Sequence, residues 1–278
     1  MESFMQPDTK FITILRHPKT LLNSVFYYMN FDQDLQRIGF PKPSNYSVNS
    51  TGLDEFFKHP EKYYKAASNT SITSLLRNGM LFDLGFDIQK AKNVSDDTVH
   101  TMTEQVTKDF DLVLIMEHFD ESLVVMMREF CWSFEDILYV KQNARTANEH
   151  ELQPETVDRI TEWARPDLLL YEHFNQTLWN KIRSYGDGFW KDLDDFRSRL
   201  QEVYTNCNLV AYDAKAHLST IRIEKFRVGP NVDRKHRPFC QKLFYTEVDY
   251  IKRFRKMYEL ENNRRTKGKF ANKIEIKT

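Results

Sequence analysis

The chain has 278 residues, enough for one large domain or at most two. Its 41% hydrophobic and 14% aromatic residues can bury a sizeable core, which excludes a disordered chain. Lys and Arg together number 40, as do Asp and Glu, so the formal net charge is zero. A neutral chain gives no electrostatic argument for an anionic membrane or a nucleic acid, and we expect no nucleic-acid partner.

Two kinds of sequence signal disagree about the compartment. No apolar run is long enough to predict a transmembrane helix, and the first ten residues lack the features of a signal peptide, which favours a cytosolic protein. Asn-x-Ser/Thr sequons favour a secretory chain instead, although chance sequons without glycans would give the same pattern. The candidate glycosylation residues are Asn45, Asn49, Asn69, Asn93 and Asn175.

Three cysteines leave the redox state of the chain open. Cys131, Cys207 and Cys240 form either one disulfide and a free thiol, or three buried thiols. No Cys-x-x-Cys pair and no Cys/His spacing typical of zinc occurs in the sequence, so we expect no metal.

The first predicted unit is a strand followed by a helix. Apolar residues over 11–15 predict a buried strand, and Pro18 suits the first turn of a helix. Arg16 then lies at the carboxyl end of the strand and Ser24 lies on the helix, where ligands bind in open α/β sheets. A guanidinium and a hydroxyl there suit a phosphate, although a surface cation and an ordinary helical serine would give the same pattern.

Loops and short helices are predicted next. Residues 39–52 predict an exposed loop, and residues 53–67 predict a helix interrupted at His59-Pro60. We interpret residues 78–87 as a loop packed on the core. Its two carboxylates either orient sugar hydroxyls or cap turns; they are Asp83 and Asp87.

A second strand and helix follow. Residues 110–116 predict a buried strand, and Asp120 is placed to N-cap a helix over 121–132. Glu117 and His118 directly follow the strand, so they are either candidates for a general base or simply polar loop residues. Two strand-to-helix units predict an α/β fold, with a parallel sheet flanked by helices.

Two cations follow the second unit, Lys141 and Arg145. They either guide an anionic substrate or are solvated surface charges. The chain contains no Gly-rich phosphate loop, nucleophile elbow or H-E-x-x-H motif that would name a reaction directly.

The C-terminal half is predicted to be mostly helical. Residues 168–204 predict two antiparallel helices, separated at Gly186 and Gly188. Residues 247–261 predict a charged amphipathic helix. The basic tail, about 262–278, is expected to be solvated and frayed.

Several segments together resemble one family, the galactose-3-O-sulfotransferases, whose best-known member is galactosylceramide (cerebroside) sulfotransferase. These segments are ITILRHPKTLLNSVFYYMNF, NGMLFDLGFD, FDLVLIMEHFDESLVVMMREFCWSFEDILYVKQNAR and LYEHFNQTLWNKI. The resemblance implies one domain over 1–278 with a P-loop-like sulfotransferase fold. It also implies 3′-phosphoadenosine 5′-phosphosulfate (PAPS) as donor, without a metal. The implied acceptor is the 3-hydroxyl of a terminal galactose on a glycolipid such as galactosylceramide, or on a glycan.

Carried over by motif, Arg16 and Ser24 match the family's residues for the 3′-phosphate of the donor. The family's usual Arg-Asp-Pro corner is Arg16-His17-Pro18 here. In the family, a membrane anchor and a Lys-containing loop for the 5′-phosphosulfate precede this element, and the base is expected on that loop. Residues 1–10 do not resemble either segment, so membrane association is expected through a segment absent here.

Two expectations follow from the resemblance. The first is a Golgi membrane enzyme whose lumenal domain is a galactose-3-O-sulfotransferase. The alternative is an inactive remnant that binds nucleotide, glycan or a partner protein.

Overall fold

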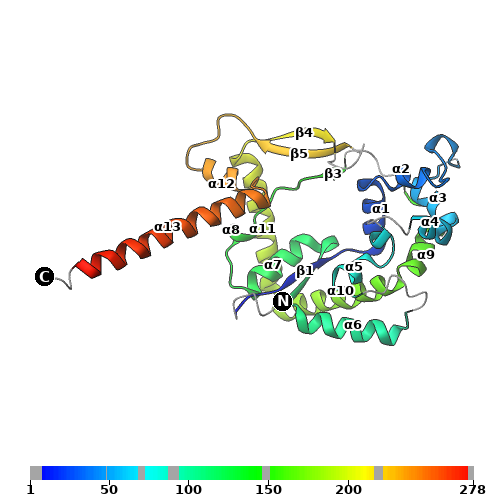
Figure 1. Ribbon diagram of the computed structural model, residues 1–278, viewed down its shortest axis with the longest axis horizontal. Helices are drawn as coiled ribbons and strands as arrows, with labels where there is room; N and C mark the ends of the chain where they lie inside the picture. The colour runs from blue at the N-terminus through cyan, green and yellow to red at the C-terminus, as the bar shows by residue number, and fades with distance from the viewer. Residues whose placement is uncertain are drawn as a thin grey trace. The chain divides into compact units, whose positions relative to one another are not determined.

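The structure is a computed structural model, shown in Figure 1. It describes residues 8–47, 49–67, 73–86, 94–145, 151–215 and 222–274. Three predicted site residues lie outside the described residues: Asn69, Asp87 and Asn93.

The chain divides into two compact units. One consists of Met1–Leu200 and Tyr212–Lys225, and the other of Gln201–Ala211 and Phe226–Thr278. The single sulfotransferase domain expected over 1–278 stays a prediction.

Helices predominate in the first unit. They are α1 (Pro18–Tyr28), α2 (Phe31–Gln36), α3 (Gly52–Lys58), α4 (Pro60–Ala67), α5 (Gly79–Asp83), α6 (Asp96–Asp109), α7 (Phe119–Glu129), α8 (Phe134–Ile137), α9 (Pro154–Trp163), α10 (Arg165–Tyr185) and most of α11 (Asp187–Asn206). Short 3-10 turns cover Pro43–Asn45, Thr73–Leu76 and Met116–His118. The helix expected over 53–67 is confirmed, with its break at His59 between α3 and α4.

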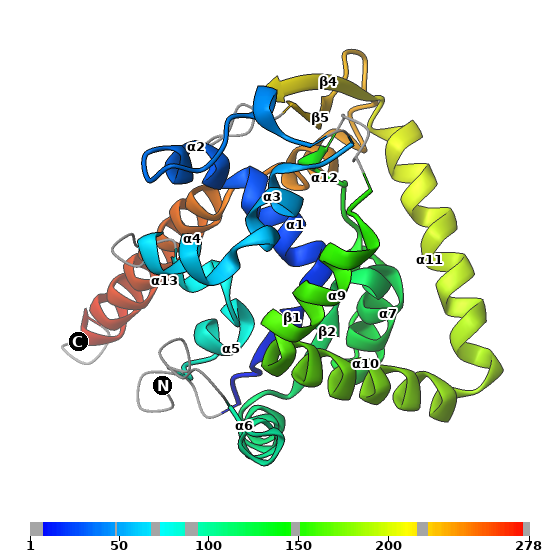
Figure 2. The ribbon, with the colours of Figure 1, turned by 90° about the vertical axis from the view of Figure 1, so that its right-hand side faces the viewer.

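The two predicted strands form a parallel pair. β1 (Ile12–Leu15) and β2 (Leu112–Ile115) are aligned from Ile12 opposite Leu112 to Leu15 opposite Ile115. Each strand leads into a helix, β1 into α1 and β2 into α7, and Figure 2 labels all four elements. The α/β class and the parallel sheet are therefore confirmed. The carboxyl ends of β1 and β2 lie at the same edge of this sheet.

The two strands differ in burial. All four residues of β2 are buried, whereas Ile12 and Ile14 of β1 are 43% and 42% exposed. Alternate side chains of a strand point to opposite sides, and the described residues cover the side that carries these two isoleucines only in part. The prediction of a fully buried strand over 11–15 is therefore wrong at these positions.

The core of the first unit has two parts. The part beside the sheet joins β2, α7, α10 and α11 through residues such as Leu114, Val124, Leu170 and Phe196. The other part joins α1, α3, α4 and α9 around Phe26, which is completely buried among aromatic rings. The sheet-side core fixes β2 and α10, and these two elements carry residues of the candidate site.

The loop predicted over 78–87 is wrong, because its first half is the helix α5. The carboxylate of Asp167 accepts hydrogen bonds from the backbone N–H groups of Met80 (3.1 Å) and Leu81 (3.0 Å). A helix this short needs partners for its first N–H groups. The partner lies 87 residues away from Met80, so no local pattern signals it.

The predicted N-cap of α7 is also wrong. A 3-10 turn follows β2, and it places His118 rather than Asp120 at the N-cap. Asp120 lies in the first turn of α7, where its carboxylate accepts from the hydroxyl of Tyr139 (2.9 Å) and pairs with Arg197 (3.1 Å).

The predicted break in the long helical segment is confirmed at Gly186, which ends α10 with a positive φ of 65°. Gly188 lies inside α11. Figure 2 shows α10 and α11 running away from this corner in different directions and not side by side, so the predicted antiparallel pair is wrong. Both helices instead pack on α7, where Phe189 joins the sheet-side core and Arg128 pairs with Asp192 (2.6 Å).

A second, three-stranded sheet was not predicted. Its order is β3 (Ala144–Arg145), β5 (Arg222–Val228), β4 (Leu209–Lys215), and β3 runs antiparallel to β5. The strand β3 is only two residues long, and β4 and β5 mix charged and apolar residues. These strands therefore lack the apolar alternation that predicts a strand.

A disulfide joins Cys207 to Cys240 in the second unit. This unit also contains α12 (Arg237–Lys242) and α13 (Glu247–Ile274). The helix α13 continues to Ile274, so the frayed tail expected from 262 is wrong over most of its length. None of the described helices is long and apolar enough to cross a membrane.

Candidate functional site

Arg16 lies at the carboxyl end of β1, in the corner that leads into α1. Its backbone N–H contacts the sulfur of Met80 (3.4 Å), and its Nε donates to the hydroxyl of Thr20 (3.1 Å). The side chain is half-buried. No carboxylate within the described ranges forms an ion pair with it. A half-buried guanidinium without a direct ion-pair partner among the described residues is suited to an incoming anion.

Ser24 lies on α1, one turn beyond Thr20, and is half-buried. Residues four apart share a helix face. Thr20 and Ser24 therefore extend a polar row from Arg16 along α1. Thr20, which sequence reasoning missed, thus lies on α1 between the two predicted phosphate-site residues. The sequence signal that could have identified Thr20 is its spacing of four residues from both Arg16 and Ser24.

Glu117 lies at the same edge of the sheet, because it belongs to the 3-10 turn that follows β2. Its carboxylate accepts from the backbone N–H of His17 (3.0 and 3.2 Å to the two oxygens) and from the hydroxyl of Thr20 (2.6 Å). Tyr171 of α10 is close enough for the charge of this carboxylate to act on its hydroxyl. The carboxylate of Glu117 therefore fastens the Arg16 corner to the end of the neighbouring strand.

Tyr171 is a buried residue beside this corner. Burial, followed by the negative charge of Glu117, raises the pKa of the Tyr171 hydroxyl to about 12. The phenol therefore stays protonated at neutral pH and remains a hydrogen-bond donor.

His17 takes the N-cap position of α1. Its Nδ1 accepts from the backbone N–H of Lys19 (3.2 Å), and its ring meets the ring of Tyr171 edge-on at 5.1 Å. Burial lowers the pKa of the imidazole, which favours the neutral form that this acceptor role requires. The unusual His in this corner is thus a functional cap for the helix.

The other strand-end candidate, His118, has a different environment. Its ring is half-buried and meets Trp179 of α10 edge-on at 4.8 Å. The structure thus places it between the start of α7 and α10.

The helix α5 connects a predicted substrate residue to the Arg16 corner. Asp83 is exposed at the carboxyl end of α5, while Met80, near the other end, contacts Arg16. The buried carboxylate of Asp167 accepts hydrogen bonds from the first turn of this helix. Burial raises the pKa of Asp167 to about 6. Asp167 is thus a second residue that sequence reasoning missed.

The two cations after α8 lie outside the β1–β2 sheet. Lys141 is exposed in the segment before β3. Arg145 belongs to β3, paired with Ile223 of β5, and so lies in the other sheet.

The described sequons occupy two environments. Asn45 and Asn49 are exposed, on a 3-10 turn and in the loop after it. Asn175 is half-buried on α10.

Cys131 is exposed as a free thiol, and Cys207 and Cys240 form a disulfide. Of the two alternatives left open by the sequence, the structure therefore shows one disulfide and one free thiol. The described residues contain no group of three or more His, Cys, Asp or Glu that could hold a metal ion.

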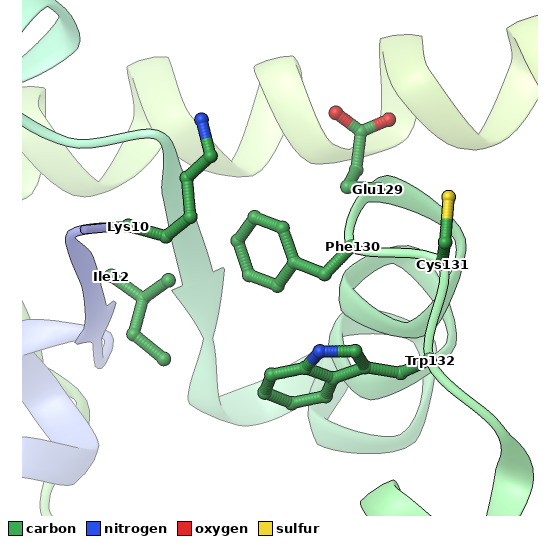
Figure 3. Close-up of a pocket in the computed structure, with 6 residues that line it drawn as sticks. All are labelled: Lys10, Ile12, Glu129, Phe130, Cys131 and Trp132. Atoms are coloured by element: carbon green, nitrogen blue, oxygen red, sulfur yellow. The ribbon is translucent and has the colours of Figure 1, made fainter. Parts of the chain in front are cut away.

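A cavity of about 350 Å³ lies at the opposite, amino end of β1 (Figure 3). Phe130 and Trp132 turn their rings toward Ile12 there. Its two charged residues have partners, Lys10 with Asp111, and Glu129 with Lys181 and Tyr185. This cavity is therefore separate from the Arg16 corner.

A family model described as Galactose-3-O-sulfotransferase matches residues 1–258. The chain belongs to the galactose-3-O-sulfotransferase family. The family predicted from the sequence is therefore confirmed. Membership makes the Arg16 corner, in which the family motif and the unpaired guanidinium coincide, the leading candidate site.

Named relatives in this family are similar at about 30% identity. Galactosylceramide sulfotransferase of Homo sapiens is 31% identical over 256 residues, 87% of this chain and 57% of the relative. The Bos taurus protein of the same name is 29% identical over 266 residues, 90% of this chain and 60% of the relative. Galactose-3-O-sulfotransferase 3 of Mus musculus is 34% identical over 211 residues, 74% of this chain and 46% of the relative.

The chain spans about 60% of the length of the galactosylceramide sulfotransferases that it matches. No solved structure matches it significantly.

Proposed function

We propose that this chain is the part of a galactose-3-O-sulfotransferase that binds the 3′-phosphate of PAPS through Arg16 and Ser24. The observation that carries the proposal is the half-buried Arg16, which has no carboxylate partner within the described ranges and stands at the carboxyl end of a parallel strand. Family membership supplies the chemistry of the anion. The guanidinium would bind two phosphate oxygens, and the Ser24 hydroxyl would donate to a third.

The proposed reaction is in-line transfer of a sulfuryl group from PAPS to the 3-hydroxyl of a terminal galactose. A base removes the proton of the acceptor hydroxyl, and cations stabilise the charge that develops on the transferring and leaving oxygens. We do not assign the base to Glu117, since its carboxylate is engaged by the backbone N–H of His17 and the hydroxyl of Thr20. The names of the relatives support galactosylceramide or another galactose-terminated glycan as acceptor.

A P-loop-like sulfotransferase fold is part of this proposal. The supporting observation is the pair of parallel strands, each leading into a helix, with the phosphate candidates at the shared carboxyl edge.

We also propose that the chain is located in the Golgi lumen, associated with the membrane. The disulfide between Cys207 and Cys240 supports an oxidising compartment, because disulfides persist in the secretory pathway and are rare in the cytosol. The exposed sequons at Asn45 and Asn49 are compatible with this location.

The experiment combines transfer and binding on the 278-residue protein. Labelled PAPS and galactosylceramide test transfer, and calorimetry with 3′,5′-adenosine bisphosphate tests the phosphate site. Sulfated product supports the enzyme. Binding of the bisphosphate without transfer supports the inactive remnant, and absence of binding contradicts the phosphate site.

A further inference from the structure

A hydroxyl holds the guanidinium of Arg16. Its Nε donates to Oγ1 of Thr20 at 3.1 Å, across one turn at the start of α1. This bond uses the inner nitrogen of the guanidinium fork. Among the described residues no acceptor is recorded for the two terminal nitrogens, so both remain for a different acceptor.

Thr20 is itself fixed by a carboxylate. Its hydroxyl lies 2.6 Å from an oxygen of Glu117, and a longer alternative, 3.0 Å, leads to the backbone oxygen of His17. When the hydroxyl donates to Glu117, its lone pairs are free to accept from Nε of Arg16. A continuous hydrogen-bonded row then runs from Glu117 through Thr20 to Arg16.

The row begins at the end of the sheet. Glu117 lies in the 3-10 turn after the buried strand β2, and its carboxylate also accepts from the N–H of His17. An arginine side chain loses rotamer freedom when it binds a ligand, and prior orientation reduces that loss.

We propose that Thr20 is the positioning residue of Arg16 and orients its terminal nitrogens toward the 3′-phosphate, while Glu117 holds the Thr20 hydroxyl in its accepting orientation. This inference rests on the proposed function of Arg16. Thr20 acts through the guanidinium and does not contact the nucleotide. Its effect on affinity therefore depends on the presence of Arg16.

The test is a double-mutant cycle on the 278-residue protein. Thr20→Val keeps the shape of the side chain and removes the hydroxyl, whereas Thr20→Ser keeps the hydroxyl. Loss of one hydrogen bond should weaken binding of 3′,5′-adenosine bisphosphate about fivefold in Thr20→Val, and Thr20→Ser should stay within about twofold. Neither variant should change binding of adenosine 5′-phosphate. Thr20→Val should have no effect in an Arg16→Ala background.

The outcomes separate the inference from the function that it rests on. Wild-type affinity in Thr20→Val, or an undiminished Thr20→Val effect in the Arg16→Ala background, overturns the positioning role alone. If Arg16→Ala leaves bisphosphate binding unchanged, the proposed phosphate site fails as well.

A second measurement needs no nucleotide. The Nε–H proton of Arg16, followed by NMR in arginine-labelled protein, should exchange with water slowly in the wild type and Thr20→Ser, and rapidly in Thr20→Val. Arg37 is the internal reference, because its side chain is 83% exposed. Exchange of Arg16 as fast as that of Arg37 in the wild type would overturn the inference, even if Thr20→Val failed to fold.

Discussion

The buried carboxylate of Asp167 should make the stability of the first unit depend on pH. Asp167 is 2% exposed, and burial raises its pKa from 3.8 to about 6. The folded protein therefore binds this proton more readily than the unfolded chain does. Stability from this group is present at low pH and is lost as the pH rises from about 4 through 6.

The size of the effect follows from the difference in pKa. A shift of 2.2 units, from 3.8 to about 6, corresponds to about 3 kcal/mol in total, at about 1.4 kcal/mol per unit. About 2 kcal/mol of it falls between roughly pH 4.5 and 7.5. Asp167→Asn keeps one of the two oxygen acceptors that bind the N–H groups of Met80 and Leu81, and it does not titrate, so it should lack this dependence.

The assay is urea unfolding, followed by tryptophan fluorescence, of the wild type and Asp167→Asn across this pH range. The free energy of unfolding of the wild type, relative to the variant, should fall by about 2 kcal/mol as the pH rises. Asp97→Asn, an exposed carboxylate on α6, is the control and should follow the wild type within about 0.5 kcal/mol. Parallel curves for the wild type and Asp167→Asn would refute the reasoning.

Two further predictions concern the aromatic core and the disulfide. Phe26→Ala should lower the free energy of unfolding by about 3–5 kcal/mol, because Phe26 is fully buried. Tyr28, on the same helix, is 40% exposed, so Tyr28→Ala should lower it by less than about 1 kcal/mol. Similar losses for the two variants in urea unfolding would contradict the described core. Peptide mapping without reductant should find Cys207 linked to Cys240 and Cys131 alkylated, and a bridge to Cys131 would be the contrary result.

The local parts of the fold were predictable from the sequence. The patterns around residues 11–31 and 110–130 each contain a strand, a corner and a helix within about 20 residues, so local periodicity was sufficient. Their parallel pairing followed from that repetition. Arg16 and Ser24 could be named as candidates because their positions depend only on this local unit.

Interactions between distant segments could not be predicted in this way. Glu117 is 97 residues from Thr20, and Asp167 is 87 residues from Met80. Nothing in a local pattern distinguishes these carboxylates from solvated ones. The sequence therefore identified Glu117 only as a base candidate, and missed Thr20 and Asp167.

The central claim is that Arg16 binds the 3′-phosphate of the donor. The most direct measurement compares the affinity of wild type and Arg16→Ala for 3′,5′-adenosine bisphosphate and for adenosine 5′-phosphate, by calorimetry on the 278-residue protein. Loss of hydrogen bonds from a charged group should weaken bisphosphate binding by about tenfold to a hundredfold. Binding of the monophosphate should change little. Equal losses for both nucleotides, or no loss for the bisphosphate, would contradict the account.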